Sequence, residues 1–127
     1  MISVILPVIS KKYLKESVDS ILNQTYKNFE LIVILEKSNE QIEIENILNK
    51  YNDKRIIIIK NNKKLGLAKS LNIGVDKSKG KYIARMDSDD VSLENRLEIE
   101  YNYMEKHNDV DILATNAEYF GNVNGPW

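Results

Sequence analysis

The sequence has no cysteine, one histidine and only two prolines among its 127 residues. The absence of cysteine excludes disulfide bonds, thiolate metal sites and cysteine nucleophiles. No apolar run approaches the roughly 20 residues that a membrane-spanning helix needs, so we expect no transmembrane segment. The segment Met1–Pro7 lacks the basic region and the cleavage site of an export signal. We therefore expect a cytoplasmic protein, either free or peripheral at the inner face of the membrane.

Neither sign of charge dominates the chain. The 18 Lys and Arg residues against 19 Asp and Glu residues leave a formal net charge of −1, so a nucleic acid is not an expected partner. No glycine-rich phosphate loop follows the first strand-like segment and no Walker A sequence occurs, which argues against an NAD-type dinucleotide site. Apolar content of 43% and charged content of 29% are typical of one soluble domain, residues 1–127.

Apolar stretches alternate with amphipathic stretches along the chain. The pattern predicts strands at residues 3–8, 29–35, 55–59 and 81–86, and a fifth apolar segment at 110–115. It predicts helices at residues 12–24, from a capping box at Ser38 and Gln41 to about 51, at 66–77, and from Asp90 or Ser92 onward. Because the strands are apolar throughout, we expect an α/β fold with a parallel sheet covered on both faces.

Ligands of such sheets bind outside the carboxyl ends of the strands, and polar residues follow each predicted strand. These residues are Ser10, Glu36, Asn61–Lys64 and Asp87–Asp90. For Glu36, a solvated acid at a strand end is the favoured interpretation, and an acceptor for a ribose hydroxyl or a base N–H is the alternative. Gly66 fits a loop position with positive φ, and it would also let a ligand approach the backbone.

The segment Asp87–Asp90 places three carboxylates within four positions after an apolar strand. Charges of one sign at this spacing repel, and each raises the pKa of the others. A divalent cation held by oxygen ligands together with a phosphate would relieve this repulsion. Capping of the following helix, whose dipole favours acids in its first turn, explains the same residues equally well on spacing alone. Asp90 could cap while Asp87 and Asp89 bind an ion.

Five segments, taken in order, resemble the family 2 inverting glycosyltransferases. They are Ser3–Val8, Tyr13–Tyr26, Phe29–Val33, Gly66–Gly74 and Gly80–Asp90, the last of which is similar to the metal-binding D-x-D segment of that family. The resemblance covers nearly the whole chain and favours metal binding over helix capping for the acidic segment. It implies a Rossmann-like GT-A fold, a three-layer sandwich with a mainly parallel sheet. It also implies Mg²⁺ or Mn²⁺ as the cofactor.

The resemblance further implies a transferase that moves a sugar, with inversion, from a nucleotide-sugar to an acceptor. The donor would be a UDP-sugar, and the acceptor a saccharide or a lipid-linked saccharide of a cell-surface polysaccharide. Residues that would contact the nucleotide are Pro7, Val8, Glu36, Gly66, Asp87 and Ser88, with Glu36 at the uracil or ribose and Gly66 at the base. Asp87 and Asp89 would bind the metal that bridges the diphosphate.

The sequence departs from the family pattern at several positions. Ile9–Ser10 replaces the usual Tyr-Asn, and Leu71 stands where many members carry Arg. The second strand ends in Leu35–Ser38 instead of an Asp-Asp-Gly-Ser type turn, so Glu36 keeps the charge on a side chain one methylene longer. These changes bear on the identity of the donor.

The chain also resembles only the first half of the family's catalytic domain. The second half supplies the acceptor surface and the general base, so we expect the base to lie outside residues 1–127. We expect the nucleotide-sugar-binding half of a truncated GT-A domain, whose apolar surface a second copy or the missing C-terminal half would cover. The alternative function is a catalytically incomplete module that binds a nucleotide-sugar and metal, or a partner. A response-regulator reading is disfavoured because the third strand ends in Ile59–Asn61, without an acid.

Overall fold

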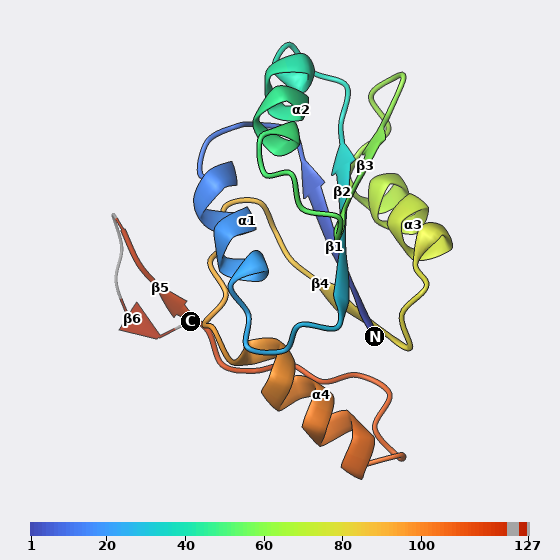
Figure 1. Ribbon diagram of the computed structural model, residues 1–127, viewed down its shortest axis with the longest axis vertical. Helices are drawn as coiled ribbons and strands as arrows, with labels where there is room; N and C mark the ends of the chain where they lie inside the picture. Colours follow the sequence, from blue (N-terminus) through green and yellow to red (C-terminus); the bar gives the residue numbers. More distant parts are fainter. Residues whose placement is uncertain (122–124, 127) are drawn as a thin grey trace.

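The computed structural model describes residues 1–121 and 125–126, in which strands and helices alternate (Figure 1). The elements are β1 (Ile2–Val8), α1 (Leu14–Leu22), β2 (Phe29–Leu35), α2 (Gln41–Asn49), β3 (Ile56–Lys60), α3 (Leu67–Lys77), β4 (Tyr82–Arg85), α4 (Arg96–Lys106), β5 (Glu118–Tyr119) and β6 (Gly125–Pro126). The predicted α/β class is confirmed, and each of the four predicted strands corresponds to an observed one.

The main sheet has the strand order β3-β2-β1-β4, and all of its pairs are parallel. β1 pairs with β2 along its whole length, from Ile2 opposite Phe29 to Val8 opposite Leu35. It pairs with β4 over a shorter stretch, which ends at Ile5 opposite Arg85. Because the strands are parallel, the segments that follow them meet at one carboxyl edge, toward which β1 and β2 point at the top of Figure 1.

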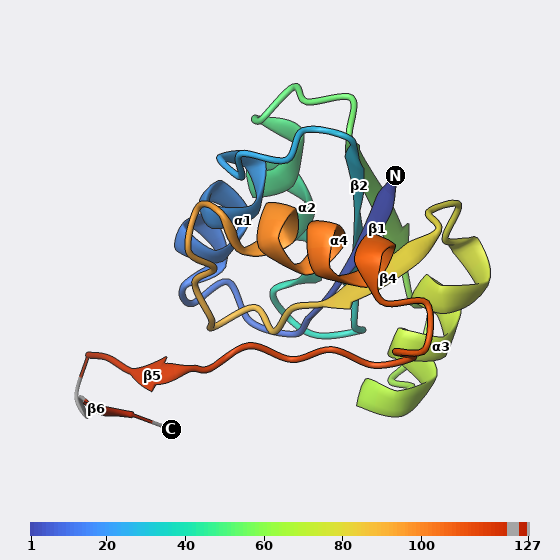
Figure 2. The same cartoon turned by 90° about the horizontal axis from the view of Figure 1, so that it is seen from below.

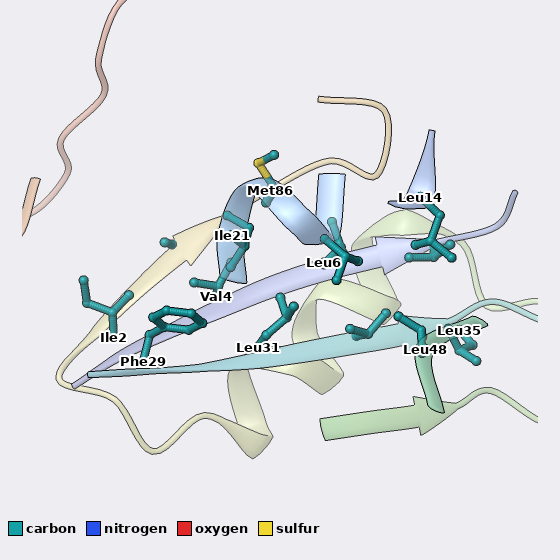
Figure 3. Packing of buried hydrophobic residues seen from close by; sticks show 14 of the residues in the cluster. Ile2, Val4, Leu6, Leu14, Ile21, Phe29, Leu31, Leu35, Leu48 and Met86 are labelled. Atoms are coloured by element: carbon teal, nitrogen blue, oxygen red, sulfur yellow. The ribbon is translucent and has the colours of Figure 1, made fainter. Parts of the chain in front are cut away.

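The two faces of the sheet are covered unequally. Figure 2 shows α3 on one side of the sheet and α1 and α2 on the other. The larger apolar cluster lies on the face of α1, where Val4, Leu6 and Ile21 are fully buried (Figure 3). The opposite face has a small cluster in which Ile32 and Ile34 pack with residues of α3. Alternate residues of β2 therefore face different layers, and its even-numbered residues face α3.

Two details of the sequence prediction are wrong. Gln41 does not form a capping box with Ser38: its buried side-chain amide donates to the carbonyls of Leu35, Glu36 and Asn61. Helix α4 begins at Arg96, later than Asp90 or Ser92, because the residues between are held as a loop against α1. The apolar segment 110–115 is irregular, and the short pair β5 and β6 lies away from the main sheet (Figure 2).

Candidate functional site

The order of the strands reverses between β1 and β4. From β1 the chain builds outward through β2 to β3, and then returns to place β4 on the other side of β1. Such a switch point leaves a crevice between the diverging connections, and ligands of open parallel sheets bind there. Pro7, Val8 and the segment Asp87–Asp90 flank this crevice, so the topology brings these predicted residues together.

Pro7 marks the position at which β1 and β4 separate. The carbonyl of Ile5 still accepts a hydrogen bond from Met86 N–H at 3.0 Å, on the β4 side. Two residues on, Pro7 has no N–H to offer on that side. The carbonyl of Val8 accepts the Glu36 N–H at 2.8 Å on the β2 side, and Val8 as a whole is only 2% exposed. Of the two residues, Pro7 is the more exposed.

The acidic segment forms a turn, in which Asp90 N–H donates to the carbonyl of Asp87 at 3.2 Å. The Asp87 carboxylate is half-exposed and pairs with the Arg85 guanidinium at 3.1 Å, whereas Asp89 is exposed. Burial raises the pKa of Asp90, and the neighbouring charges of Asp89 and Asp87 raise it further. The repulsion expected from the sequence is therefore present. Asp90 does not cap a helix, because α4 begins at Arg96 with Asn95 as its N-cap.

A polar face of α1 fixes the acidic segment. Ser17 Oγ donates to the carbonyl of Asp87 at 3.2 Å, and Ser20 Oγ accepts the Ser92 N–H at 3.1 Å. The Gln24 amide donates to the carbonyl of Leu93 at 2.7 Å and accepts the Leu97 N–H at 3.0 Å. The sequence alone did not predict these contacts. Their signal was the spacing of residues 17, 20 and 24, which puts polar side chains beside the apolar stripe of α1 and just beyond its end.

Glu36 is only 6% exposed, so its interpretation as a solvated strand-end acid is wrong. Its Oε2 accepts the N–H of Gly66 at 2.6 Å, and its Oε1 accepts the N–H of Leu65 at 3.0 Å and of Lys37 at 3.0 Å. The Asn61 amide donates to the same Oε1 at 3.3 Å. Burial alone would raise the pKa of Glu36, but the hydrogen bonds from Leu65, Gly66, Lys37 and Asn61 together outweigh it and lower the pKa.

A buried polar network supports this carboxylate. The Asn61 side chain also donates to Ser70 Oγ of α3 at 2.9 Å, and the Gln41 amide donates to the Asn61 carbonyl at 2.9 Å. In the described part of the chain, every buried side-chain nitrogen and oxygen has a hydrogen-bond partner. Satisfied polar networks of this kind fix one arrangement of the loops that they join.

Gly66 adopts φ +85° and ψ 169° as the N-cap of α3, a conformation that favours glycine, so its predicted positive φ is confirmed. A Cβ built at this position would meet nothing within 4 Å. Lys63 and Lys64 beside it are exposed. Ser10, by contrast, turns back to its own loop, where its Oγ accepts the Lys12 N–H at 3.2 Å.

The donor set at the crevice suits a hard divalent cation. Across residues 1–121 and 125–126, no group of three His, Asp or Glu side chains is arranged to hold a metal ion by itself. Mg²⁺ is usually bound through one or two carboxylates, with phosphate oxygens of a ligand and water completing its shell. Asp87 and Asp89 supply two such carboxylates beside an edge where a phosphate-bearing ligand would lie. The residues therefore fit an ion that is shared with a ligand.

A separate hollow of about 330 Å³ lies between β4, α4 and residues 111–113, and neither Asp87 nor Asp89 lines it. Among the described residues, no helix is both long and apolar enough to cross a membrane.

Curated relatives of this chain carry glycosyltransferase names. Over 117 residues it is 46% identical to the uncharacterized glycosyltransferase MJ1057 of Methanocaldococcus jannaschii, covering 91% of this chain and 40% of that protein. Over 129 residues it is 46% identical to the O-antigen biosynthesis glycosyltransferase WbnJ of Escherichia coli, covering 98% of this chain and 49% of that protein. The chain thus spans less than half the length of either relative.

Solved structures agree in fold. The crystal structure of S. aureus TarS 1–349 in complex with UDP-GlcNAc matches with a TM-score of 0.77 at 26% identity, over 84% of this chain and 32% of that one. The mannosyltransferase PcManGT of Pyrobaculum calidifontis, in complex with GDP-Man and Mn²⁺, matches with a TM-score of 0.64 at 20% identity, over 71% of this chain and 28% of that one. The predicted GT-A fold is confirmed. The model of glycosyl transferase family 2 matches residues 3–127, and the chain belongs to that family.

Proposed function

We propose that this chain is the donor-binding half of a glycosyltransferase that uses a UDP-sugar and inverts the anomeric centre. The carrying observation is the reversal of strand order at the carboxyl edge, with Asp87 and Asp89 in the segment after β4 and the Glu36-bound loop 61–66 after β3. The likeness to TarS, which was solved with UDP-GlcNAc at 26% identity, supports the choice of donor. The name of WbnJ supports a surface polysaccharide as the product and a saccharide or lipid-linked acceptor.

In this proposal the nucleotide lies across the crevice. Pro7 and Val8 border it from β1, and Gly66 offers a backbone without a side chain on the other side. Ser88 and Asp87 lie in the turn that closes the crevice toward β4, where a hydroxyl or a carboxylate would contact the ribose. Glu36 belongs to the same site through the loop that it binds.

Asp87 and Asp89 would hold Mg²⁺ or Mn²⁺ together with the diphosphate. A bound divalent cation supplies neutralising charge for the departing nucleoside diphosphate. The protein's part is to hold the segment that carries the carboxylates. Ser17 does this by donating to the backbone carbonyl of Asp87, and Arg85 does it by pairing with the Asp87 carboxylate.

A general base must accept the proton of the attacking hydroxyl. We place this base outside residues 1–127, in the part of the relatives that this chain does not span. Pairing with a second copy, and a place in the cytoplasm, stay predictions.

The test is a calorimetric titration of UDP into the full chain, first with Mn²⁺ and then with EDTA. We expect binding that depends on the metal, and we expect Asp89→Ala to weaken it at least tenfold without changing the far-UV circular dichroism. Asp76→Asn, an exposed acid on α3, is the matched control and should bind like the wild type. UDP affinity that is unchanged in Asp89→Ala would overturn the metal assignment. Absence of UDP binding by the folded wild type would overturn the proposed function.

A further inference from the structure

The Glu36 carboxylate has little capacity left for a ligand. A carboxylate offers about four lone-pair directions. Its Oε1 accepts from Lys37, Asn61 and Leu65, and its Oε2 accepts from Gly66 at 2.6 Å and from Leu65 at 3.2 Å. These are five contacts from four donor groups, all within the protein. An N–H of a nucleobase would have to displace one of them.

The donors show what the carboxylate holds. Leu65 and Gly66 lie 29 and 30 residues beyond Glu36, at the end of the loop that leads into α3. Gly66 is the N-cap of α3, so the negative charge also lies at the favourable end of that helix dipole. Asn61, at the start of the loop, donates to the same carboxylate. Glu36 thus contacts both ends of the loop 61–66.

The family pattern has a shorter acid at the end of this strand. An aspartate ends one methylene earlier, so its carboxylate would lie roughly 1.5 Å short of the loop amides. The extra length of Glu36 is what lets both oxygens reach the backbone of Leu65 and Gly66. The longer side chain of Glu36 and its occupied oxygens both indicate that it holds the loop 61–66 in place.

We propose that Glu36 is a positioning residue, which fixes the loop 61–66 as a wall of the nucleotide site and does not itself accept a hydrogen bond from the base. This inference rests on the proposed function. It replaces the direct contact with uracil or ribose that the family resemblance implies. Discrimination between bases then belongs to the loop backbone and its neighbours.

The two roles predict different base selectivity. Uracil presents an N–H at N3, whereas cytosine presents a bare acceptor nitrogen there. A carboxylate that accepts the N3–H favours UDP over CDP, and its conversion to an amide changes that ratio. A carboxylate that only holds the loop affects both nucleotides alike.

The experiment measures UDP and CDP affinities of the full chain by calorimetry with Mn²⁺, for the wild type, Glu36→Gln and Glu36→Asp. We expect both variants to weaken UDP and CDP binding by the same factor, about tenfold and within twofold of each other, which corresponds to about 1.4 kcal/mol. Glu30→Gln, on the same strand but at its other end, is the matched control and should leave both affinities unchanged. A UDP-to-CDP ratio that changes tenfold in Glu36→Gln, or wild-type affinity in Glu36→Asp, would overturn the inference.

A second measurement needs no variant. Amide hydrogen exchange of Leu65 and Gly66 in the wild type reports whether their N–H groups stay bonded to Glu36. We expect their protection to be kept or increased when UDP and Mn²⁺ are added. A tenfold loss of protection would show that the nucleotide takes the carboxylate, and would overturn the inference while the proposed function stands. A wild type that binds neither nucleotide would overturn the proposed function and this inference with it.

Discussion

Both ends of β2 have a buried glutamate that accepts hydrogen bonds from the backbone, but the two glutamates have different roles. Glu30 at the amino end and Glu36 just beyond the carboxyl end are both buried acids that face α3, and each accepts backbone N–H groups from a segment flanking that helix. Glu30 uses one oxygen, Oε1, for both Ser3 Oγ and the Lys79 N–H. Glu36 uses both of its oxygens.

The surroundings of the two acids differ in the space that they leave. Near Glu30, a Cβ on Gly80 would lie 2.5 Å from the backbone nitrogen of Ser3, so that end is closed by packed backbone. Near Glu36, a Cβ on Gly66 would meet nothing within 4 Å. The amino end is thus a closed structural joint, and the carboxyl end is a similar joint beside open space. Of the two ends, only the second leaves space beside its glycine.

We expect the largest loss of unfolding free energy at the closed amino end of β2. Gly80→Ala forces a methyl group against the backbone of Ile2 and Ser3, which cannot yield as a side chain tip can. Overpacking of this kind costs about 3 kcal/mol of unfolding free energy. Urea denaturation measures it, with Lys79→Ala as the control because the Lys79 side chain is exposed. A Gly80→Ala chain as stable as the control would mean that the joint is not closed.

The acidic segment at the open end should depend on Gln24. Gln24→Leu leaves the Leu97 N–H and the Leu93 carbonyl without their side-chain partner, which costs about 2 kcal/mol. We also expect metal-dependent UDP binding to weaken, because the loop carrying Asp89 loses an anchor. Denaturation and calorimetry on the same samples separate the two effects. Affinity equal to that of the wild type would show that Gln24 does not position the acids.

Substituting either of the two glutamates should cost less unfolding free energy, and the two losses should differ. Glu30→Gln retains an oxygen where both of its donors converge, so we expect a loss of about 0.5 kcal/mol or less. Glu36→Gln must turn an NH₂ group toward the N–H of Leu65 or Gly66, and we expect a loss of about 1.5 kcal/mol. Thermal and urea unfolding of both variants test the order. Equal losses of unfolding free energy would show that it makes no difference to stability whether the glutamate accepts hydrogen bonds with one oxygen or with both.

We expect acidic pH to reduce the difference in unfolding free energy between the wild type and Glu36→Gln. The pKa of Glu36 is lower in the folded chain than its ordinary value of 4.5, so ionised Glu36 stabilises the fold above pH 4.5. This contribution is lost as the pH falls through the folded pKa. The gap in unfolding free energy between wild type and Glu36→Gln is therefore largest near neutral pH and shrinks below pH 4.5. A series of urea titrations would measure it, and a gap that is constant with pH would contradict the assignment.

Periodicity was enough to predict the layers of this fold. The run 29–35, apolar except for Glu30, is β2 with the predicted bounds, and the isoleucines of 56–59 lie in β3 as expected. Such runs report burial on both faces of a parallel sheet, which is a local property of the sequence. The placement of Glu36 and Asp87 at one edge followed from the parallel topology in the same way.

The partners of the polar residues could not be predicted. Glu36 and Gly66 are 30 residues apart, and Gln24 and Leu97 are 73 apart, so nothing local in the sequence joins them. Gln41 fits a capping box by spacing, but tertiary burial assigns its amide to three carbonyls. Side chains that can cap, turn or bind are chosen among these roles only when the loops meet.

Pro7 has a consequence for assembly. Beyond Ile5, the side of β1 that faces the gap left by β4 would present an N–H and a carbonyl at residue 7 if that residue were not proline. A foreign strand, or the end of β4 itself, would find there a template on which to add hydrogen bonds. The pyrrolidine ring of Pro7 removes the N–H donor at this position, so the hydrogen-bond ladder between β1 and β4 does not continue into the gap. Pro7 thus opposes extension of the sheet into the gap beside β4, and leaves that gap available to a small ligand.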